Sequence, residues 1–353
     1  MSDDQRSEEF SALEYLAVPT GSLINYKTAI SDIFVRLPSQ RMVRIAHKGE
    51  VIDMARIDRF GDKDVQVLYV YKTDFDSVVT ELVRNAVALS NQKGTSDEKL
   101  GRFFSVAESV YTELLRLPLT TDSFDRAVQV TGYIGEQMTE KPDFRMLLRS
   151  VVTLGDDFSR HSLGTVVMSN MMMVPLGWKN AKLVQPITMG AFFHDIGLKD
   201  IPEELRFKSR VEMTKEETAV WETHPAIGAH LLNSMHTVSA ETIRIVMEHH
   251  EVPNGTGFPN KYRLDRMYPM AKVVSLSNML AHDIFDPQKD DKPFSIDGLV
   301  DKIDLVYSQM FGNDLAKAAR SLFRKAEVSK PPSATPTEPK SDPESDGSGS
   351  SAA

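Results

Sequence analysis

The sequence predicts a mainly α-helical protein with a small α+β region at its N-terminal end. Two observations support this fold class. Short β-branched and aromatic stretches are confined to about the first 75 residues, and apolar residues recur at helical intervals after them. A chain of 353 residues is long enough for about two domains. We therefore expect an N-terminal α+β domain at 1–140 that senses a signal or binds a partner, a helical domain at 141–328 and a disordered tail at 329–353.

The α+β region is predicted from two segments. The sequence RMVRIAHKGEVIDMARI at 41–57 is typical of two short strands that flank a turn at His47-Lys48-Gly49. The sequence DVQVLYVY at 64–71 is rich in valine and tyrosine, which favour strands. We expect three strands from these segments.

The helical part begins near Asp74. In FDSVVTELVRNAVAL the residues Val79, Leu82, Val83 and Ala86 fall at i, i+3, i+4 and i+7, which places them on one helix face. The same spacing predicts further helices at 98–117, 144–173 (one long element or a pair), 186–197, 241–251 and 270–284. The methionine-rich stretch at 168–174 is interpreted as adaptable core packing.

Composition excludes several classes of protein. The chain has 41 basic and 50 acidic residues, a net charge of −9, which argues against a general surface for nucleic-acid polymers or membranes. There are no cysteines, no apolar run of membrane-spanning length and no signal-peptide pattern at the N-terminus, so a cytoplasmic location is expected. The tail from Lys330, rich in proline, serine and acidic residues, is expected to be disordered.

Histidines are concentrated in one part of the chain. Eight of the nine lie between residues 161 and 282, and His47 is the exception. His250 shares the apolar face of the helix predicted at 241–251, and the adjacent His249 lies at its edge. Asp195 follows His194 within the apolar sequence AFFHDIG, where a charged carboxylate is costly to bury unless it is paired or bound to a cation.

A single buried histidine is more often a hydrogen-bonded core residue than a ligand, and we interpret His47, His230, His236 and His282 in that way. The remaining histidines, taken together with Asp195, are better explained by a shared metal site. Without cysteine, the ligands must be histidine, carboxylate, asparagine or water, which favours iron, manganese or a His/carboxylate zinc site.

The order of these motifs resembles the HD-GYP family, a branch of the HD metal-dependent phosphohydrolases. The matching stretches are FSRHS, FFHDIG, THPAIGAHLL, EHHE, NGTGFP and the helix through LSN, over roughly residues 150–310. The resemblance implies an HD-type helical bundle with a centre of two metal ions, iron or manganese, and cyclic di-GMP or a related cyclic dinucleotide as the bound molecule.

The resemblance also implies roles for individual residues. His194 and Asp195 would be catalytic, and Asp195 would bridge the two metals. Lys199 and the loop residues Gly257, Phe258 and Pro259 would contact the substrate. The implied metal ligands are His161, His194, Asp195, His224, His249, His250 and Asn278, with Asp157 at the position of a glutamate that serves an additional metal in some members.

The sequence departs from the family pattern at four places. Phe258 stands at the signature tyrosine, Leu198 at the usual lysine, with Lys199 one step later, and Asn278 at a usual carboxylate. The segment 286–294 is a poor match to the family's arginine-containing segment. The chain thus resembles members that lack the tyrosine, and two functions stay open: a cyclic di-GMP phosphodiesterase, or a weakly active receptor that acts through a signalling partner. A third, less favoured hypothesis is that the chain is a different HD phosphohydrolase that acts on nucleotides.

Overall fold

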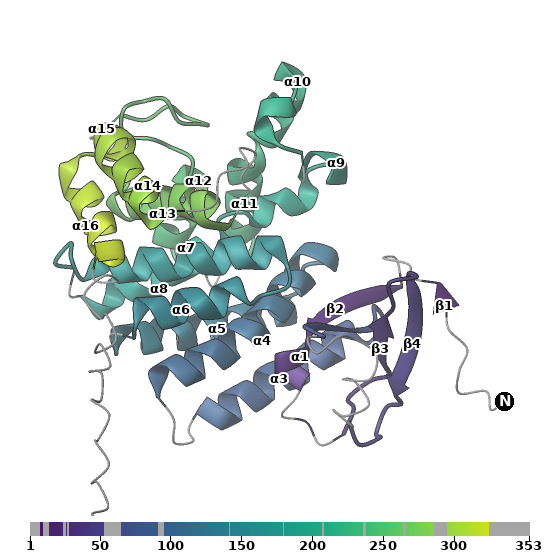
Figure 1. The fold of residues 1–353 in the computed structure, drawn as a ribbon. Coiled ribbons are helices and arrows are strands. Elements are labelled where there is room, and N and C mark those ends of the chain that lie inside the picture. Colours follow the sequence, from purple (N-terminus) through teal and green to yellow (C-terminus); the bar gives the residue numbers. More distant parts are fainter. Residues whose placement is uncertain are drawn as a thin grey trace, which may run out of the picture.

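The computed structural model describes residues 8–324, apart from 10–13, 24–25, 27, 53–64, 91–94, 141, 179, 207, 236–237, 264–265 and 286–294. The predicted tail, most of the predicted second strand within 41–57, and the segment 286–294 therefore lie outside the described residues. The mainly helical fold class with a small N-terminal sheet is confirmed (Figure 1).

The N-terminal part contains one antiparallel sheet. Its strand order is β1-β4-β3-β5-β2. Alternate side chains of β2 face opposite sides, so Tyr15 packs with Phe34 and Met42 on one face while Leu16 joins the main core on the other. Val51, expected in a strand that pairs with 41–46, forms instead an isolated bridge with Thr28. The strands are β1 Glu8–Glu9, β2 Tyr15–Pro19, β3 Ile33–Arg36, β4 Arg41–Ala46 and β5 Val67–Tyr71.

One short helix, α1 at Thr20–Leu23, lies between β2 and β3 and contacts α4. The other described helices follow the last strand of the sheet. The helices that precede the histidine-rich region are α3 Phe75–Ser90, α4 Ser96–Arg116, α5 Thr121–Thr139 and α6 Phe144–Val152. Helices α4 and α5 contact α7 and α8, which carry predicted site residues at or next to their ends. The domain boundary near residue 140 stays a prediction.

The histidine-rich region forms a helical bundle in which α7 packs against both α13 and α8. The segment predicted at 144–173 is a pair of helices, α6 and α7. The bundle consists of α7 Asp157–Met173, η2 Ala181–Leu183, α8 Val184–Phe193, η3 Ile196–Asp200, α9 Glu203–Arg206, η4 Arg210–Glu212, α10 Lys215–Trp221, α11 His224–Asn233, α12 Ala240–Glu248, α13 Pro269–Phe285, α14 Ile296–Lys302, η5 Ile303–Tyr307, α15 Ser308–Phe311 and α16 Asn313–Arg324.

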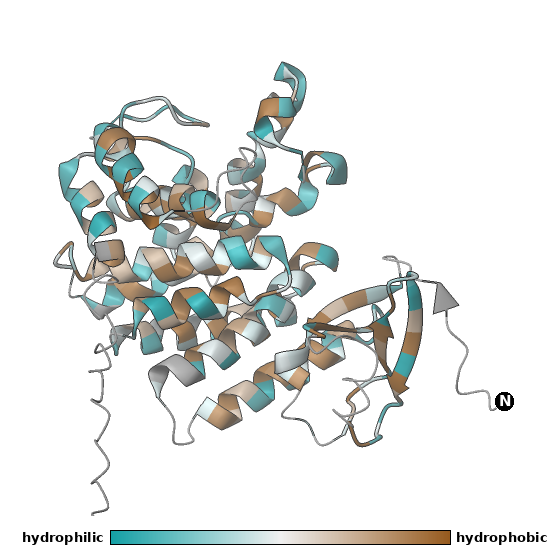
Figure 2. Ribbon diagram, in the orientation of Figure 1, coloured by the Kyte–Doolittle hydropathy of each residue, from teal (hydrophilic) through white to brown (hydrophobic). Residues whose placement is uncertain are grey.

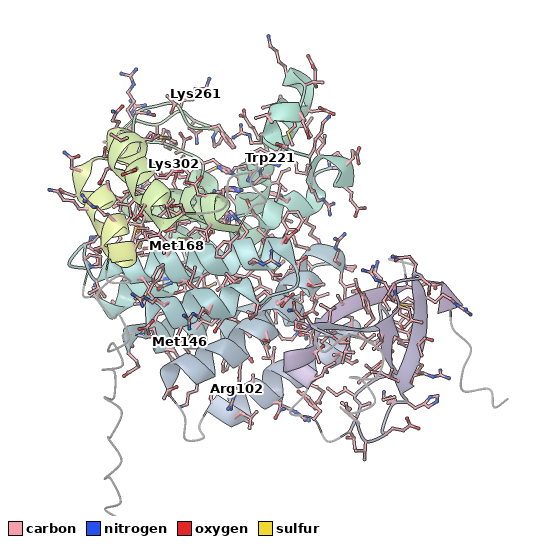
Figure 3. The ribbon with its side chains drawn as sticks, viewed as in Figure 1. Arg102, Met146, Met168, Trp221, Lys261 and Lys302 are labelled. Carbon is pink, nitrogen blue, oxygen red and sulfur yellow. The ribbon has the colours of Figure 1, made fainter. Side chains whose placement is uncertain are left out.

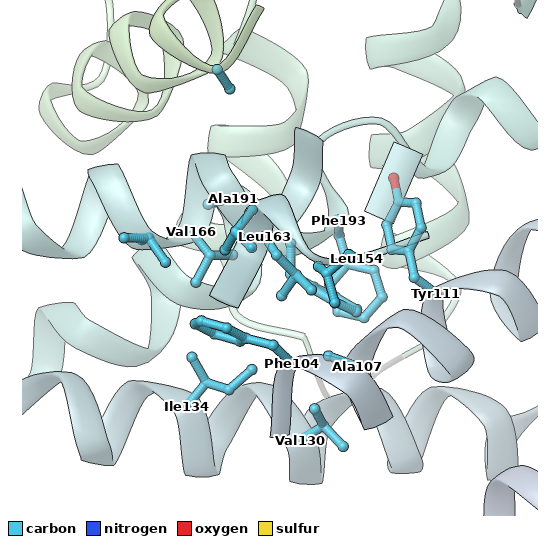
Figure 4. Close-up of a cluster of buried hydrophobic side chains, with 14 of the residues drawn as sticks. Phe104, Ala107, Tyr111, Val130, Ile134, Leu154, Leu163, Val166, Ala191 and Phe193 are labelled. Carbon is cyan, nitrogen blue, oxygen red and sulfur yellow. The ribbon is translucent and has the colours of Figure 1, made fainter. Parts of the chain in front are cut away.

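The main hydrophobic core runs between the α4–α5 layer and the α7–α8 layer (Figure 4). Phe104 and Tyr111 on α4 meet Leu163 on α7 and Phe193 on α8, and all four side chains are fully buried. Burying a large side chain of this kind contributes roughly 1.5–3 kcal/mol. The core therefore fixes the helices on which the histidines stand.

Hydrophilic and hydrophobic residues alternate along the helices (Figure 2). Accordingly, none of the described helices combines the length and the apolar character that crossing a membrane requires.

Candidate metal centre

Asp195 joins two groups of potential metal ligands. The first group is Asp195 with His161 and His194, and the second is Asp195 with His224, His249 and His250. Within each group the ligand atoms lie within 4.8 Å of one another. These residues come from α7, the α8–η3 junction, α11 and the end of α12, so the bundle brings together the histidines that the sequence grouped. The metal-ligand roles themselves stay predictions.

Each carboxylate oxygen of Asp195 faces one group. Oδ2 lies 3.2 Å from His194 Nε2 and 3.9 Å from His161 Nε2. Oδ1 lies 3.3 Å from His224 Nε2 and 3.4 Å from His249 Nε2. A carboxylate whose two oxygens face different groups of histidines has the arrangement needed to bridge two cations.

Helix ends orient three of the histidines. The carbonyls of a helix's last turn have no partner within the helix, so a nearby N–H can bond to them. His194 and His249 directly follow α8 and α12, and His224 lies three residues beyond the last residue of α10. In each case Nδ1 bonds to the carbonyl three residues earlier, and the distances are 2.7 Å for His194 to Ala191, 2.8 Å for His224 to Trp221 and 2.7 Å for His249 to Val246.

These bonds determine which nitrogen faces the cluster centre. A carbonyl only accepts, so Nδ1 carries the proton and the neutral ring presents a lone pair at Nε2. His224 Nε2 and His249 Nε2 lie 3.2 Å apart, and both face Asp195 Oδ1. Two lone pairs and a carboxylate oxygen repel one another unless a cation lies among them. The donor set therefore fits a bound metal ion.

Several residues of this region also carry buried polar atoms without a partner among the described residues. These atoms are Asp195 Oδ1, His250 Nε2, Asn278 Oδ1 and His161 Nδ1, and within the described part of the chain none of them has a hydrogen-bond partner. A buried polar group without a partner costs about 1–3 kcal/mol. Asn278 on α13 is 1% exposed and lies beside His161. A role of its amide oxygen as a metal ligand stays a prediction.

The electrostatic environment favours the neutral form of three of the imidazoles. Burial lowers the pKa of His249 to about 4, and burial together with neighbouring histidines lowers the pKa of His161 and His250 well below its usual range. Burial alone would raise the pKa of Asp195, but its contacts with the histidines hold it well below the usual value. Neutral imidazoles and an ionised carboxylate are the forms that bind metals.

Glycines allow the segments that carry these ligands to pack closely. A Cβ on Gly197, in the sequence HDIG, would lie 2.0 Å from the His224 carbonyl oxygen. A Cβ on Gly257 would lie 2.4 Å from the His250 carbonyl oxygen. Both positions therefore require glycine, because a side chain would push η3 from α11 or the 251–262 loop from the paired histidines.

The loop places Phe258 against the cluster. The Phe258 amide donates to the His250 carbonyl at 3.1 Å, and its ring stacks on His250 with centroids 4.5 Å apart and planes at 24°. Phe258 also packs in a separate hydrophobic cluster with Leu198 and Trp221. Two of the four departures from the family pattern, Phe258 and Leu198, thus belong to one apolar cluster beside the candidate metal ligands.

Two predicted site residues are not directed into the cluster. The Lys199 ammonium donates to the carbonyls of Leu114 and Leu117 at the end of α4, which gives it a capping contact and argues against phosphate binding in this conformation. Asp157 pairs with Arg160 at 2.6 Å, and its side chain is 84% exposed. Asp157 lies one helical turn before His161, and its role as a ligand of an additional metal stays a prediction.

The sequence interpretation missed two residues at the site. The His282 ring lies 4.2 Å from that of His161, and Trp221 lies 4.5 Å from His224 and 5.3 Å from His250 by ring centroids. Trp221 is placed where the α10 projection joins the bundle (Figure 3). The spacing of four between Asn278 and His282 on one helix could have indicated His282.

Comparisons with known proteins agree with this geometry. Residues 146–283 match the family model described as "HD domain". Over 112 residues the chain is 27% identical to a cyclic di-GMP phosphodiesterase of Pseudomonas aeruginosa. The matched region covers 32% of this chain and 26% of that protein. The chain thus matches about a quarter of the length of that curated relative.

One solved structure shares the fold over most of the chain. An HDG"Y"P protein from Bdellovibrio bacteriovorus superposes with a TM-score of 0.64 at 20% identity, over 88% of this chain and 99% of that one. The HD domain of the L. monocytogenes phosphodiesterase PgpH gives a TM-score of 0.37 at 15% identity, over 51% of this chain and 96% of that one.

Proposed function

We propose that this chain, which contains an HD domain and resembles the HD-GYP family, hydrolyses a cyclic dinucleotide at a binuclear centre bridged by Asp195, with cyclic di-GMP as the first candidate. The observation that carries the proposal is the division of Asp195 between the two histidine pairs. The similarity to a cyclic di-GMP phosphodiesterase supports the choice of substrate.

The residues of the cluster suit an anionic substrate. In the forms that bind metals, five neutral imidazoles, one amide and one ionised carboxylate carry a total charge of −1, so the centre would stay electropositive with two divalent ions bound. Such ions, iron or manganese in our proposal, would polarise the phosphodiester and lower the pKa of the attacking water. The helix-end carbonyls hold His194, His224 and His249 in the ligating tautomer, and Asp195 fixes the spacing of the two halves.

The surface beside the ligands favours a second candidate function. Leu198 and Phe258 are 4% and 8% exposed and pack together with Trp221. An apolar surface here lacks the lysine and the tyrosine hydroxyl implied by the resemblance. A receptor that retains metals and nucleotide but turns over slowly, and passes the signal to a partner protein, is the alternative.

The deciding experiment is cyclic di-GMP hydrolysis by the full chain, purified anaerobically and loaded with iron or manganese. We expect hydrolysis that is lost in Asp195→Ala and retained in Asp32→Ala, which removes a carboxylate paired with Arg44 near the sheet. Bound metal and bound nucleotide without hydrolysis would support the receptor instead. Full metal content in Asp195→Ala would refute the bridging role.

A further inference from the structure

An arginine from outside the histidine cluster covers the aromatic surface beside it. Arg210 begins η4, and its Cζ lies 4.8 Å from the ring centroid of Trp221 and 5.2 Å from that of Phe258. Phe258 in turn stacks on His250. A single aromatic ring thus separates the guanidinium from a candidate metal ligand.

The guanidinium has capacity for another partner. Its Nη2 donates to Glu222 Oε1 at 2.8 Å, and the side chain is 48% exposed. A guanidinium carries five N–H donors in a planar fork that fits phosphate oxygens in pairs. Contact with two rings restricts the movement of the guanidinium, so less freedom is lost when a phosphate binds.

Other cations near the ligands are engaged elsewhere. Lys199 caps the end of α4. Arg160 pairs with Asp157 and also donates to the Leu154 carbonyl. Leu198, at the position where the resemblance places a lysine, is buried in the apolar cluster. The contacts of the described residues thus set Arg210 apart as the cation that borders this aromatic surface.

We propose that Arg210 is a substrate-binding residue that holds the second, non-scissile phosphate of a cyclic dinucleotide. This rests on the proposed function, in which the metal centre takes the scissile phosphate. A cyclic dinucleotide carries two phosphates joined through one ring, so a site that binds the first at the metals needs a separate cation for the second. On binding, Arg210 exchanges its ion pair with Glu222 for the phosphate while it stays stacked on Trp221.

The test compares two substrates in the metal-loaded full chain. Cyclic di-GMP has the second phosphate, whereas bis(p-nitrophenyl) phosphate has a single phosphodiester. Arg210→Ala should lower kcat/KM for cyclic di-GMP roughly tenfold or more, through a higher KM. The factor lost on cyclic di-GMP should be at least about ten times the factor lost on the small diester. Arg210→Lys should recover part of the loss, because it restores the charge without the planar fork.

A second arginine provides a matched control. Arg244 stacks over Tyr268 at 4.8 Å, pairs with Glu248 at 2.6 Å and is 49% exposed. Arg244→Ala should leave the preference between the two substrates unchanged. Equal losses on both substrates in Arg210→Ala, no loss on cyclic di-GMP, or the same pattern in Arg244→Ala would overturn the proposal.

The outcome separates this proposal from the proposed function. If the wild type cleaves the small diester but not cyclic di-GMP, the hydrolase assignment for that nucleotide fails, and equilibrium binding of cyclic di-GMP then decides the role of Arg210. Weaker binding in Arg210→Ala than in Arg244→Ala supports it. Equal binding, or no binding by the wild type, overturns it.

Discussion

The two halves of the candidate metal centre differ in how firmly their candidate ligands are held. In the His224 half, formed by His224, His249, His250 and Asp195 Oδ1, both His224 and His249 have Nδ1 bonded to a helix-end carbonyl. The His161 half is formed by His161, His194, Asn278 and Asp195 Oδ2. Among the described contacts of this half only His194 has such a bond, and no described residue is a partner of His161 Nδ1.

The halves also differ in charge and surroundings. His250 is covered by Phe258 and Trp221, whereas His161 lies against the exposed ring of His282. The His161 half has an amide at the position where the resemblance implies a carboxylate. Pre-oriented ligands lose less freedom on binding, so we expect the His224 half to bind its ion more tightly.

The largest expected effect is on metal retention. Brief dialysis of the loaded protein against a chelator should leave about one ion per chain, held in the His224 half. His249→Ala should lose that ion, whereas His161→Ala should keep it. Metal analysis after dialysis measures both, with circular dichroism to establish that the helices persist. Retention in His249→Ala together with loss in His161→Ala would reverse the comparison.

A carboxylate at position 278 should reduce the difference in metal affinity between the two halves. Asn278→Asp adds a negative ligand to the His161 half and should raise its metal affinity roughly tenfold or more, because affinity follows ligand charge. The metal-free variant should be less stable, since it buries an unpaired carboxylate. Asn170→Asp, at another buried asparagine of the bundle, should not improve metal retention. Equal retention in the two variants would show that charge does not limit this half.

The position of α7, which carries His161, depends on a buried carboxylate. Glu108 Oε1 on α4 accepts from the amides of Gly155 and Asp156 at 2.9 and 2.8 Å, immediately before α7. Burial raises the pKa of Glu108 to about 7. Its folded-state pKa thus exceeds its unfolded value, so the folded protein binds more protons, and this contribution to stability is lost as pH rises through about 7.

Glu108→Gln keeps an acceptor oxygen but cannot ionise. Relative to this variant, the wild type should lose up to about 3 kcal/mol of unfolding free energy between pH 4.5 and pH 8. Denaturant unfolding of the metal-free proteins across that range measures the difference. Glu136→Gln, at an exposed glutamate, should follow the wild type. A difference between wild type and Glu108→Gln that does not change with pH would contradict the buried titration.

The sequence predicts what depends on spacing along the chain. Helical periodicity identified the bundle, and the histidine motifs identified the residues that converge on Asp195. The i−3 carbonyl bonds depend on where each helix ends, and helix boundaries are poorly defined by sequence. The contacts of Lys199 with α4, of His282 with His161 and of Arg210 with Phe258 join distant segments, and no local pattern encodes them.

The smallest effect tests the aromatic cover of the His224 half. Phe258 stacks on His250 but offers no ligand atom, so Phe258→Tyr should leave metal content unchanged. The added hydroxyl gives the pocket one neutral hydrogen-bond donor, worth about 0.5–1.5 kcal/mol, so turnover of cyclic di-GMP should rise roughly two- to tenfold. Steady-state kinetics and metal analysis on the same preparation measure both. A change in metal content would mean that Phe258 positions His250, and the firmness of this half would then depend on ring packing as well as on the helix-end carbonyls.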